Sequence, residues 1–313
     1  MAIFYNYVQR GLTSLSHFAL TGASIRHMLS NKLVQGGTDL VYILVPFVLL
    51  LLALALCIYI NPGPNVRQSN KTAWLKQVPI AHRGLHTDDA DVPENSIHAF
   101  RRAIDKGYGI EIDVQLSADG RVIVFHDYNL KRMIGLDMNT ADLTWDQLEG
   151  LRLLDGDQGI PLLKDLLSLI DGKVPLLIEV KNEGAVGPLE QALIDDLQDY
   201  TGDFAIQAFN PFVLAYIKKH APQYIRGQLS SDFKNEDLAW WKKFVLRYLL
   251  LNKISEPSFV AYETGTLPGW LAKRLKQKGL YLLTWTVKDM ESYKRDIQIF
   301  DNVIFEGFEA PRK

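Results

Sequence analysis

Residues 109–115 read Gly-Ile-Glu-Ile-Asp-Val-Gln, and this stretch decides the fold. Apolar and acidic residues alternate in it, and successive side chains of a β-strand point to opposite faces of the sheet. Glu111 and Asp113 are two residues apart, so a strand directs both carboxylates to the same side. We therefore predict a strand over 109–115 that carries two acids on one face.

Short apolar runs of the same kind recur along the chain on both sides of this stretch. We predict seven further strands, over 78–81, 174–180, 203–208, 223–229, 258–262, 280–286 and 301–305. Helical patterns fill most of the gaps, over 95–107, 186–200, 210–219, 236–251, 268–278 and 289–295. Strands that alternate with helices indicate an α/β fold with a parallel sheet.

One connection between the predicted strands is unusual. A hairpin-like strand from Arg121 to Phe125 follows the turn at Asp119-Gly120. Residues 126–173 then form a longer stretch than an ordinary strand-to-helix connection, so we expect an insertion there. Eight strand candidates in one domain favour a (β/α)8 barrel, the TIM barrel. A doubly wound open sheet is the alternative, because periodicity alone does not separate the two folds.

Residues 40–60 form a separate, strongly apolar segment of 21 consecutive residues without a charge. As a helix this segment would span roughly 30 Å, the thickness of the hydrocarbon core of a bilayer. Tyr42 and Tyr59 lie near its two ends, where amphipathic rings favour the membrane interface. We predict an uncleaved transmembrane helix, and therefore a single-pass membrane protein. Basic residues flank both ends, so the positive-inside rule favours neither orientation.

This segment divides the chain into four predicted parts. They are an N-terminal segment over 1–39 with a weak interfacial-helix pattern, the transmembrane helix over 40–60, a polar linker over 61–77 and the barrel domain over 78–313. Within the barrel domain, residues 232–256 are unusually apolar. We expect a helix that covers the barrel there, with a surface that touches lipid or a partner as the alternative.

The charge and the cysteine content limit the class of protein. The formal net charge is −2, and residues 1–61 hold three basic residues against one acid, so residues 62–313, with 31 basic and 35 acidic residues, carry a net charge of −4. Nucleic-acid binding needs a basic surface, so we expect no nucleic-acid partner. The single cysteine, Cys57, lies in the apolar segment, which leaves the barrel domain without a disulfide or a thiolate zinc site.

Acidic residues follow the predicted strands where barrel chemistry is expected, at their C-terminal ends. The strand over 174–180 carries Glu179 near its end, in the manner of Glu111 and Asp113. Three converging carboxylates without a thiolate describe a site for a hard divalent cation, which water and substrate oxygens would complete. We predict that these three residues bind Mg²⁺, Ca²⁺ or Mn²⁺.

Two histidines stand beside these acids in the predicted barrel. The first strand runs into His82, and the hairpin strand runs into His126. Two imidazoles suit general acid–base work on a phosphodiester, because one can remove a proton from the attacking group while the other protonates the leaving alkoxide. Arg83 offers a planar fork for phosphate oxygens, and Lys181 offers a compact positive charge beside the cation.

The order of these motifs resembles that of the glycerophosphodiester phosphodiesterase family. The resemblance covers essentially 78–306 and rests on His82-Arg83-Gly84, Pro93-Glu94-Asn95-Ser96, Glu111-Ile-Asp113, His126-Asp127, Glu179-Val-Lys181, Gln207-Ala-Phe209-Asn210-Pro211 and Trp285-Thr-Val287. Each motif alone is weak, whereas the full series in order is specific.

This resemblance implies a (β/α)8 barrel that hydrolyses glycerophosphodiesters to sn-glycerol 3-phosphate and an alcohol, with a bound divalent cation. Matched by position, the family's residues are the metal ligands Glu111, Asp113 and Glu179, the acid–base pair His82 and His126, the phosphate-contacting Arg83 and Lys181, the orienting acid Glu94 and the pocket aromatic Trp285. One departure is Glu306 in the last strand, where many relatives carry an aspartate; its role stays open.

Two other functions also stay open at this point. A membrane phospholipase of the C or D kind would act on lysophospholipid or phospholipid, with the anchor holding the barrel against the lipid. A non-catalytic sensor would bind a phosphodiester and report through the membrane helix. All three functions take a small glycerophosphodiester or a lipid-derived molecule, and none defines an oligomeric state.

Overall fold

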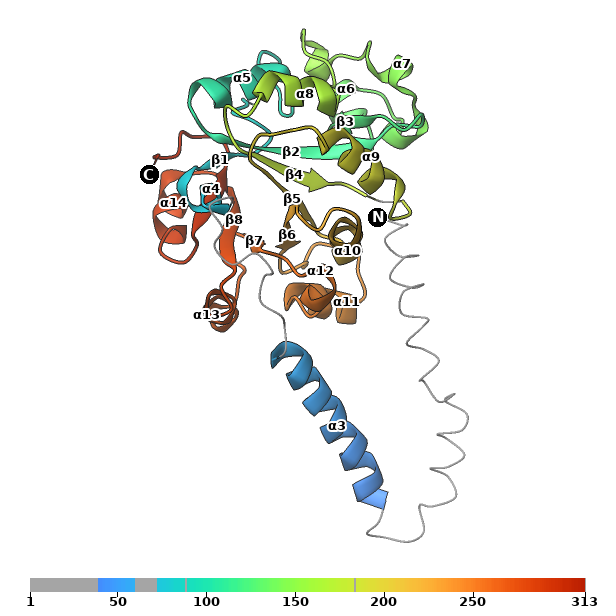
Figure 1. The fold of residues 1–313 in the computed structure, drawn as a ribbon, viewed down its shortest axis with the longest axis vertical. Coiled ribbons are helices and arrows are strands. Elements are labelled where there is room, and N and C mark those ends of the chain that lie inside the picture. The colour runs from blue at the N-terminus through green and yellow to red at the C-terminus, as the bar shows by residue number, and fades with distance from the viewer. Residues whose placement is uncertain (1–38, 60–71, 88, 183, 313) are drawn as a thin grey trace. The chain divides into compact units, whose positions relative to one another are not determined.

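A computed structural model of the chain describes residues 39–59, 72–87, 89–182 and 184–312 (Figure 1). The chain forms two units: one contains the helix α3 (Asp39–Tyr59), and the other contains every strand of the described residues. The predicted interfacial helix within 1–38 and the linker up to residue 71 lie outside the described residues.

Helix α3 coincides with the apolar segment and contains Pro46 near its start. Its described side chains run from Tyr42 to Ala55, and the large apolar ones among them are exposed. Within the residues whose side chains are described, which in α3 are those from Tyr42 to Ala55, no helix is both long enough and apolar enough to cross a membrane.

The second unit is built on one closed sheet. In the described part of the chain, eight parallel strands follow one another around it: β1 (Ile80–Ala81), β2 (Gly109–Leu116), β4 (Leu176–Val180), β5 (Phe204–Ala208), β6 (Ile225–Ser230), β7 (Phe259–Glu263), β8 (Tyr281–Val287) and β9 (Asn302–Phe305). The short β1 pairs with both β2 and β9, which closes the ring. The prediction of a (β/α)8 barrel is confirmed, and this closure excludes the doubly wound open sheet.

The register of the strands sorts their side chains between the inside and the outside of the barrel. Asp113 pairs with Glu179, and Glu179 pairs with Gln207, so these side chains share the inner face. Further down the same strands the interior is apolar and includes Leu177 and Phe259. Trp74 and Leu75 of the short helix α4 (Trp74–Gln77) join this cluster. The acids Asp113 and Glu179 therefore lie on the inner face near the C-terminal ends of their strands.

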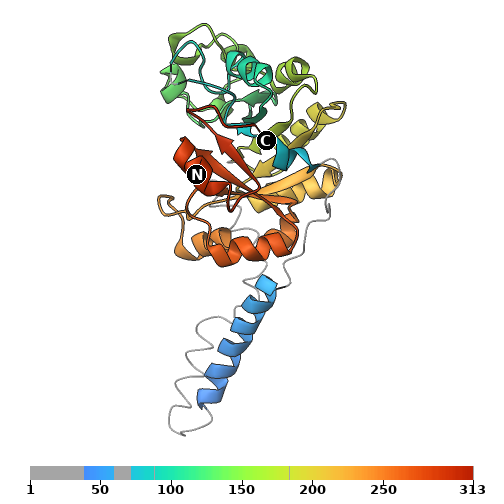
Figure 2. The ribbon, with the colours of Figure 1, turned by 90° about the vertical axis from the view of Figure 1, so that its left-hand side faces the viewer.

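Helices cover the outside of the sheet (Figures 1 and 2). They include α5 (Ile97–Asp105), α8 (Leu163–Ile170), α9 (Pro188–Leu197), α10 (Pro211–His220), α13 (Gly269–Gln277) and α14 (Met290–Asp296). The outward-facing side chains of β2, β4 and β5 pack against α5, α8, α9 and α10 in one core cluster, in which Ile112, Ile178 and Ile206 are fully buried. The predicted boundaries of α5, α9, α10, α13 and α14 agree with the structure to within a few residues, whereas α8 was not predicted.

The expected insertion forms a small layer of its own. The strand β3 (Val122–Val124) pairs antiparallel with β2. The elements α6 (Lys131–Ile134), η2 (Thr140–Asp142), α7 (Trp145–Leu148) and η3 (Leu153–Asp155) follow it and gather beside it (Figure 1). Their apolar side chains pack with Ile123 and Phe125 in a separate cluster. The insertion therefore stabilises the end of β3, from which His126 follows.

The prediction of one helix over 236–251 is wrong. The structure has α11 (Trp240–Arg247), a turn and then α12 (Asn252–Ser255). Leu249, between them, has a φ of 58°, which lies in the left-handed region and ends the helix. Leu249 is buried, so its packing holds the backbone in a conformation that its side chain disfavours.

Candidate active site

The three predicted metal-binding acids come together inside the barrel. Each of Glu111, Asp113 and Glu179 offers a carboxylate oxygen, and these oxygens all lie within 4.8 Å of one another. The three residues are buried. They converge because β2 and β4 are neighbours in register and the acids occupy inner positions at their C-terminal ends. The described residues thus contain a group of acids that is able to hold a cation.

The three carboxylates lie close enough to repel one another. Burial, together with the nearby carboxylates of Asp113 and Glu179, raises the pKa of Glu111 well above its usual value. Burial also opposes the ionisation of Asp113, but Lys181, His126 and Arg83 outweigh it and lower the pKa of Asp113. One acid of the group therefore resists ionisation.

Lys181 offsets part of the negative charge of the three carboxylates. It follows β4, and its Nζ lies 2.9 Å from Glu179 Oε1 and 3.5 Å from Asp113 Oδ1. Burial disfavours the charged ammonium, but the two carboxylates overcome this effect and raise the pKa of Lys181. Lys181 is therefore cationic and borders the acidic group, as the sequence predicted for its position.

The turn after β1 directs Arg83 into the site. Arg83 has a φ of 53°, and in this left-handed conformation its backbone N–H donates to Glu111 Oε2 at 3.1 Å. Its side chain donates from Nη1 to Glu94 Oε1 at 2.8 Å, while its Nε lies 3.4 Å from Asp113 Oδ2. Gly84 follows with a φ of 81°, and a Cβ there would press against Ala99. The turn thus fixes the guanidinium beside the acidic group.

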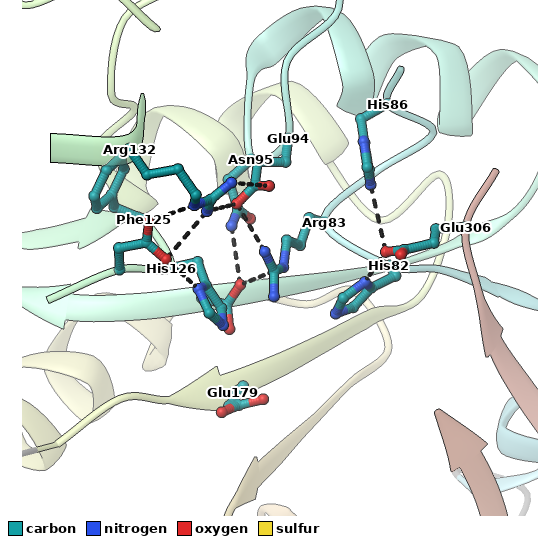
Figure 3. Close-up of polar contacts among 12 residues, drawn as sticks. His82, Arg83, His86, Glu94, Asn95, Phe125, His126, Arg132, Glu179 and Glu306 are labelled. Atoms are coloured by element: carbon teal, nitrogen blue, oxygen red, sulfur yellow. Dashed lines mark hydrogen bonds and ion pairs between the residues drawn. The ribbon is translucent and has the colours of Figure 1, made fainter. Parts of the chain in front are cut away.

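His82 is held by Glu306, the acid whose role the sequence left open. The ring Nδ1 of His82 donates to Glu306 Oε2 at 2.5 Å (Figure 3). Its Nε2 lies 4.0 Å from Glu111 Oε2 and so faces the acidic group. Burial lowers the pKa of His82, although the hydrogen bond to Glu306 opposes this effect. An imidazole that is neutral and fixed in this way can accept a proton at Nε2.

Glu306 also contacts two other positive or polar groups. Lys288 Nζ lies 2.8 Å from Glu306 Oε1, and His86 Nε2 lies 3.7 Å from Glu306 Oε2. Burial would raise the pKa of Glu306, but its hydrogen bond with His82 and its other partners lower the pKa well below the usual range. Glu306 is therefore an anion, and His86 lies behind the pair as a supporting residue.

His126 has an equivalent arrangement on the other side of Arg83 (Figure 3). Its Nδ1 donates to Asp127 Oδ1 at 2.7 Å. Arg132 then donates to Asp127 Oδ2 at 2.6 Å and to both oxygens of Glu94, at 2.9 Å and 2.7 Å. Burial opposes the ionisation of Asp127, but His126 and Arg132 lower its pKa. A chain of alternating charges therefore links His126 to Arg83 through Glu94.

Trp285 lies at the inner face of β8, near its C-terminal end. Its indole N–H donates to the Ala261 carbonyl at 3.2 Å, and its ring meets the edge of Phe209 at a centroid distance of 5.5 Å. The ring is partly exposed. Phe209 in turn meets Phe233 at 6.1 Å. These rings form an apolar wall beside the polar site.

The sequence reasoning assigned no site role to several residues that the structure brings to this place. Asp127 and Arg132 are five residues apart, and Asp127 adjoins His126, so a local search for a partner of that histidine would have found them. Glu306 is 224 residues from His82 and gives no local signal. Asn95 donates to Asp113 at 3.0 Å, and Gln207 donates to Glu111 at 3.5 Å.

The residues present fit a divalent cation. Three buried carboxylates form a set of oxygen donors that Mg²⁺ and Ca²⁺ prefer, and no cysteine lies in the barrel domain. Among the described residues, the side-chain oxygens of Asn95 and Gln207 are buried without a hydrogen-bond partner. Unsatisfied buried oxygens beside the acids indicate a site for a ligand with positive charge or hydroxyl groups.

Comparison with known proteins agrees with this arrangement. Residues 82–307 match the family model described as the glycerophosphoryl diester phosphodiesterase family. The chain is 31% identical to a glycerophosphodiester phosphodiesterase of Caldanaerobacter subterraneus subsp. tengcongensis, over 72% of this chain and 91% of that protein.

Solved structures share the fold. A glycerophosphodiester phosphodiesterase from Thermotoga maritima matches with a TM-score of 0.56 and 27% identity, over 73% of this chain and 94% of that one. A phosphodiesterase from Oleispira antarctica, in complex with the product sn-glycerol-3-phosphate, matches with a TM-score of 0.61 and 24% identity, over 74% of this chain and 92% of that one. The chain therefore belongs to the glycerophosphoryl diester phosphodiesterase family and is an enzyme of the glycerophosphodiester phosphodiesterase class.

Proposed function

We propose that this enzyme hydrolyses glycerophosphodiesters to sn-glycerol 3-phosphate and an alcohol, that the reaction depends on a divalent cation, and that His82 and His126 exchange the protons. One observation carries the proposal: a buried group of three carboxylates lies between two imidazoles that are each held at Nδ1 by an acid. The product named in the Oleispira structure supports the same substrate class.

The cation, held by Glu111, Asp113 and Glu179, would offset negative charge on the phosphoryl oxygens. Arg83 and Lys181 border the same place and add two fixed positive charges. These groups are already oriented by Glu94 and Glu179, so little reorganisation is needed when the phosphate enters. Asn95 and Gln207 present free oxygens that suit the hydroxyl groups of glycerol.

The two imidazoles would carry the proton transfers. One accepts a proton from the nucleophile, either water or the glycerol 2-hydroxyl, as the new bond to phosphorus forms. Attack by the hydroxyl would give a cyclic phosphate, which water then opens to sn-glycerol 3-phosphate. The other donates a proton to the alcohol oxygen as its bond to phosphorus breaks. Since Glu306 and Asp127 each accept from Nδ1, the Nε2 atoms are the ones left for the reacting oxygens.

Single replacements test this proposal. We expect His82→Ala and His126→Ala each to lower kcat on glycerophosphocholine by roughly 10²- to 10⁴-fold. The exposed His220, on α10, gives the matched control His220→Ala with a normal rate. Circular dichroism melting checks that the variants fold. Near-normal rates in both site variants would refute the assignment of the pair.

A substrate with a good leaving group separates the two roles. A nitrophenyl ester of glycerol phosphate releases an anion that needs no protonation, so loss of the general acid matters less. We expect one of the two histidine variants, the one that lacks the acid, to recover much of its rate on this substrate. Equal losses on both substrates in both variants would show that neither histidine is the acid.

A panel of substrates, assayed with and without metal, tests the metal requirement and the substrate class. We expect chelation to abolish hydrolysis, and Mg²⁺, Ca²⁺ or Mn²⁺ to restore it. Glycerophosphocholine, lysophospholipid and intact phospholipid compared side by side separate the glycerophosphodiesterase from a phospholipase of the C or D kind. Binding of these compounds without turnover under any metal condition would instead favour the non-catalytic sensor.

We also propose that residues 40–60 anchor the chain in a membrane as a single span. The support is the uncharged apolar sequence of this segment and its helical conformation in α3. Alkaline extraction of membranes from producing cells tests it: the full chain should stay in the pellet. Replacing Leu50 and Leu52 by arginine, at about 3 kcal/mol for each charge at a helix centre, should release it. Release of the unaltered chain would contradict the anchor.

A further inference from the structure

Three large aromatic residues, Trp240, Phe244 and Trp270, lie exposed on the outside of the barrel, and Tyr248 beside them is partly buried. Trp240 and Phe244 of α11 and Tyr248, the residue that follows it, stand at intervals of four, which places them on one face of the helix. Trp240 is 79% exposed and Phe244 is 44% exposed, and Trp270 at the start of α13 is 53% exposed. Exposed groups of this size mark a surface that binds something.

We name these four residues the aromatic patch: Trp240, Phe244, Tyr248 and Trp270. The rings of Phe244 and Tyr248 have centroids 4.8 Å apart, and Tyr248 stacks on Trp270 at 5.8 Å. The patch therefore joins two helices, which lie at the same end of the barrel unit in Figure 1.

Basic residues flank the patch on both of its helices. Helices α11 and α13 contain the basic residues Lys242, Lys243, Arg247, Lys273, Arg274 and Lys276, and neither helix contains an acidic residue. The whole chain has a formal net charge of −2, so a pair of helices with only basic charged residues differs from the average charge of the molecule. It is complementary to a negatively charged partner.

The fold attaches the patch to the rim that carries the active site. The hydroxyl of Ser230, the last residue of β6, donates to the Leu246 carbonyl at 3.1 Å. The hydroxyl of Tyr262 in β7 donates to the Arg247 carbonyl at 2.9 Å. Both bonds hold the end of α11 near the C-terminal ends of the strands, where the carboxylates and imidazoles also lie.

We propose that the aromatic patch binds the headgroup layer of a bilayer that contains anionic lipid. Tryptophan and tyrosine favour the membrane interface because their rings are apolar while their polar atoms stay hydrated. Lysine and arginine around them are attracted to anionic headgroups. The same charges disfavour a symmetric dimer through this surface, because it would place two basic patches against each other.

Intrinsic fluorescence gives a direct test with the full chain. The six tryptophans are Trp74, Trp145, Trp240, Trp241, Trp270 and Trp285, so none lies in the apolar segment and all report on the barrel unit. The chain is reconstituted in vesicles of phosphatidylcholine with or without phosphatidylglycerol, in which part of the lipid carries bromine near the headgroup. We expect the bromolipid to quench tryptophan emission in the anionic vesicles.

Two variants locate the contact. Trp240→Phe with Trp270→Phe removes the reporting rings while keeping aromatic side chains, and we expect most of the quenching to disappear. Trp145→Phe, in the insertion, is the matched control and should retain it. No quenching in the unaltered chain, or full quenching in the double variant, would overturn the proposal.

The charges are tested separately. The double variant Lys243→Gln with Lys273→Gln removes two of these charges. The ratio of barrel bound to the lipid surface to barrel not bound, measured by the quenching, should fall roughly fivefold for each lysine removed. Lys131→Gln, on the exposed surface of α6, is the control and should leave the ratio unchanged. All these variants should hydrolyse a soluble substrate normally, since none lies in the active site.

A second copy of the chain as the partner would give another result. Sedimentation in detergent would then show a dimer that the Trp240 and Trp270 replacements dissociate, and the quenching would not depend on anionic lipid. Either finding would contradict lipid binding and would show that the aromatic patch binds a second copy of the chain. We expect a sedimentation coefficient that does not change between the unaltered chain and these variants.

Discussion

Each candidate catalytic histidine is fixed by a carboxylate, but the two carboxylates are held differently. Glu306 lies between His82, His86 and Lys288, whereas Asp127 lies between His126 and Arg132. A hydrogen bond at Nδ1 fixes both the tautomer and the orientation of a ring. The roles of these acids can therefore be separated from those of the histidines by single replacements.

Replacing Glu306 by glutamine should lower kcat by roughly 10- to 100-fold, since His82 keeps its place but loses the anionic acceptor, and the amide N–H of glutamine can favour the other tautomer. Glu306→Asp keeps the charge with a shorter reach and should recover part of the rate. Lys288→Gln is the control, because it removes another contact of Glu306 and leaves its bond to His82. Steady-state kinetics with separate kcat and KM values check this. An unchanged kcat in Glu306→Gln would show that His82 needs no partner.

Replacing Asp127 by asparagine should reduce the free energy of unfolding at neutral pH by about 1 kcal/mol, because Arg132 is half exposed and water weakens the ion pair. The pKa of Asp127 in the folded protein lies below its ordinary value of 3.8. Its stabilising effect is therefore present above pH 3.8 and is lost as the pH falls further. Urea unfolding of both proteins from pH 7 to acid checks that the difference shrinks. A difference that grows in acid would contradict the sign.

At the scale of elements, the strands were predictable, because each buried strand is a short apolar run between polar turns. The pairing of β1 with β9 joins residues at opposite ends of the domain and leaves no trace in local periodicity. It was expected only because eight strand candidates and the family resemblance favoured a closed barrel. Distance in sequence also explains why no role was assigned to Glu306, which reaches His82 only through that closure. The break after α11 was also hidden, because Leu249 is neither glycine nor proline.

Tyr262→Phe tests how α11 is attached to the barrel. The buried hydroxyl of Tyr262 donates to the carbonyls of Arg247 and Ser231, and burial raises its pKa to about 12. Its loss should lower the free energy of unfolding by about 1–3 kcal/mol, because two carbonyls lose a donor. Hydrogen exchange should become faster in 240–247 than elsewhere. Tyr293→Phe, whose hydroxyl makes a longer bond to Pro311, should leave α11 unchanged.

At the scale of the whole molecule, the barrel holds like charges close together at one end. A cation that binds only the folded state stabilises it by mass action. We expect saturating Mg²⁺ or Ca²⁺ to raise the melting temperature by about 5–10 °C. Asp113→Asn should abolish this shift, and Asp137→Asn, in the exposed insertion, should retain it. An equal shift in Asp113→Asn would place the cation elsewhere.

Glu111→Gln should act in two opposite ways on the same melting curve. Without metal it should raise the melting temperature, because it removes a carboxyl group whose pKa is raised by burial and by repulsion from Asp113 and Glu179. With metal it should show a smaller shift than the unaltered chain, because a ligand is lost. Scanning calorimetry with chelator and with added cation checks both. A lower melting temperature in chelator would show that the hydrogen bonds to Arg83 and Gln207 outweigh the repulsion.

The closure of the ring by β9 has a consequence for the order in which the enzyme is made. β9 (Asn302–Phe305) is the last strand to leave the ribosome, and Glu306 follows it directly. Until these residues emerge, β1 lacks one of its two neighbours and His82 lacks its acid. A nascent chain that stalls before residue 302 would therefore carry every proposed metal ligand and both imidazoles, and His82 would still lack the acid that holds its ring.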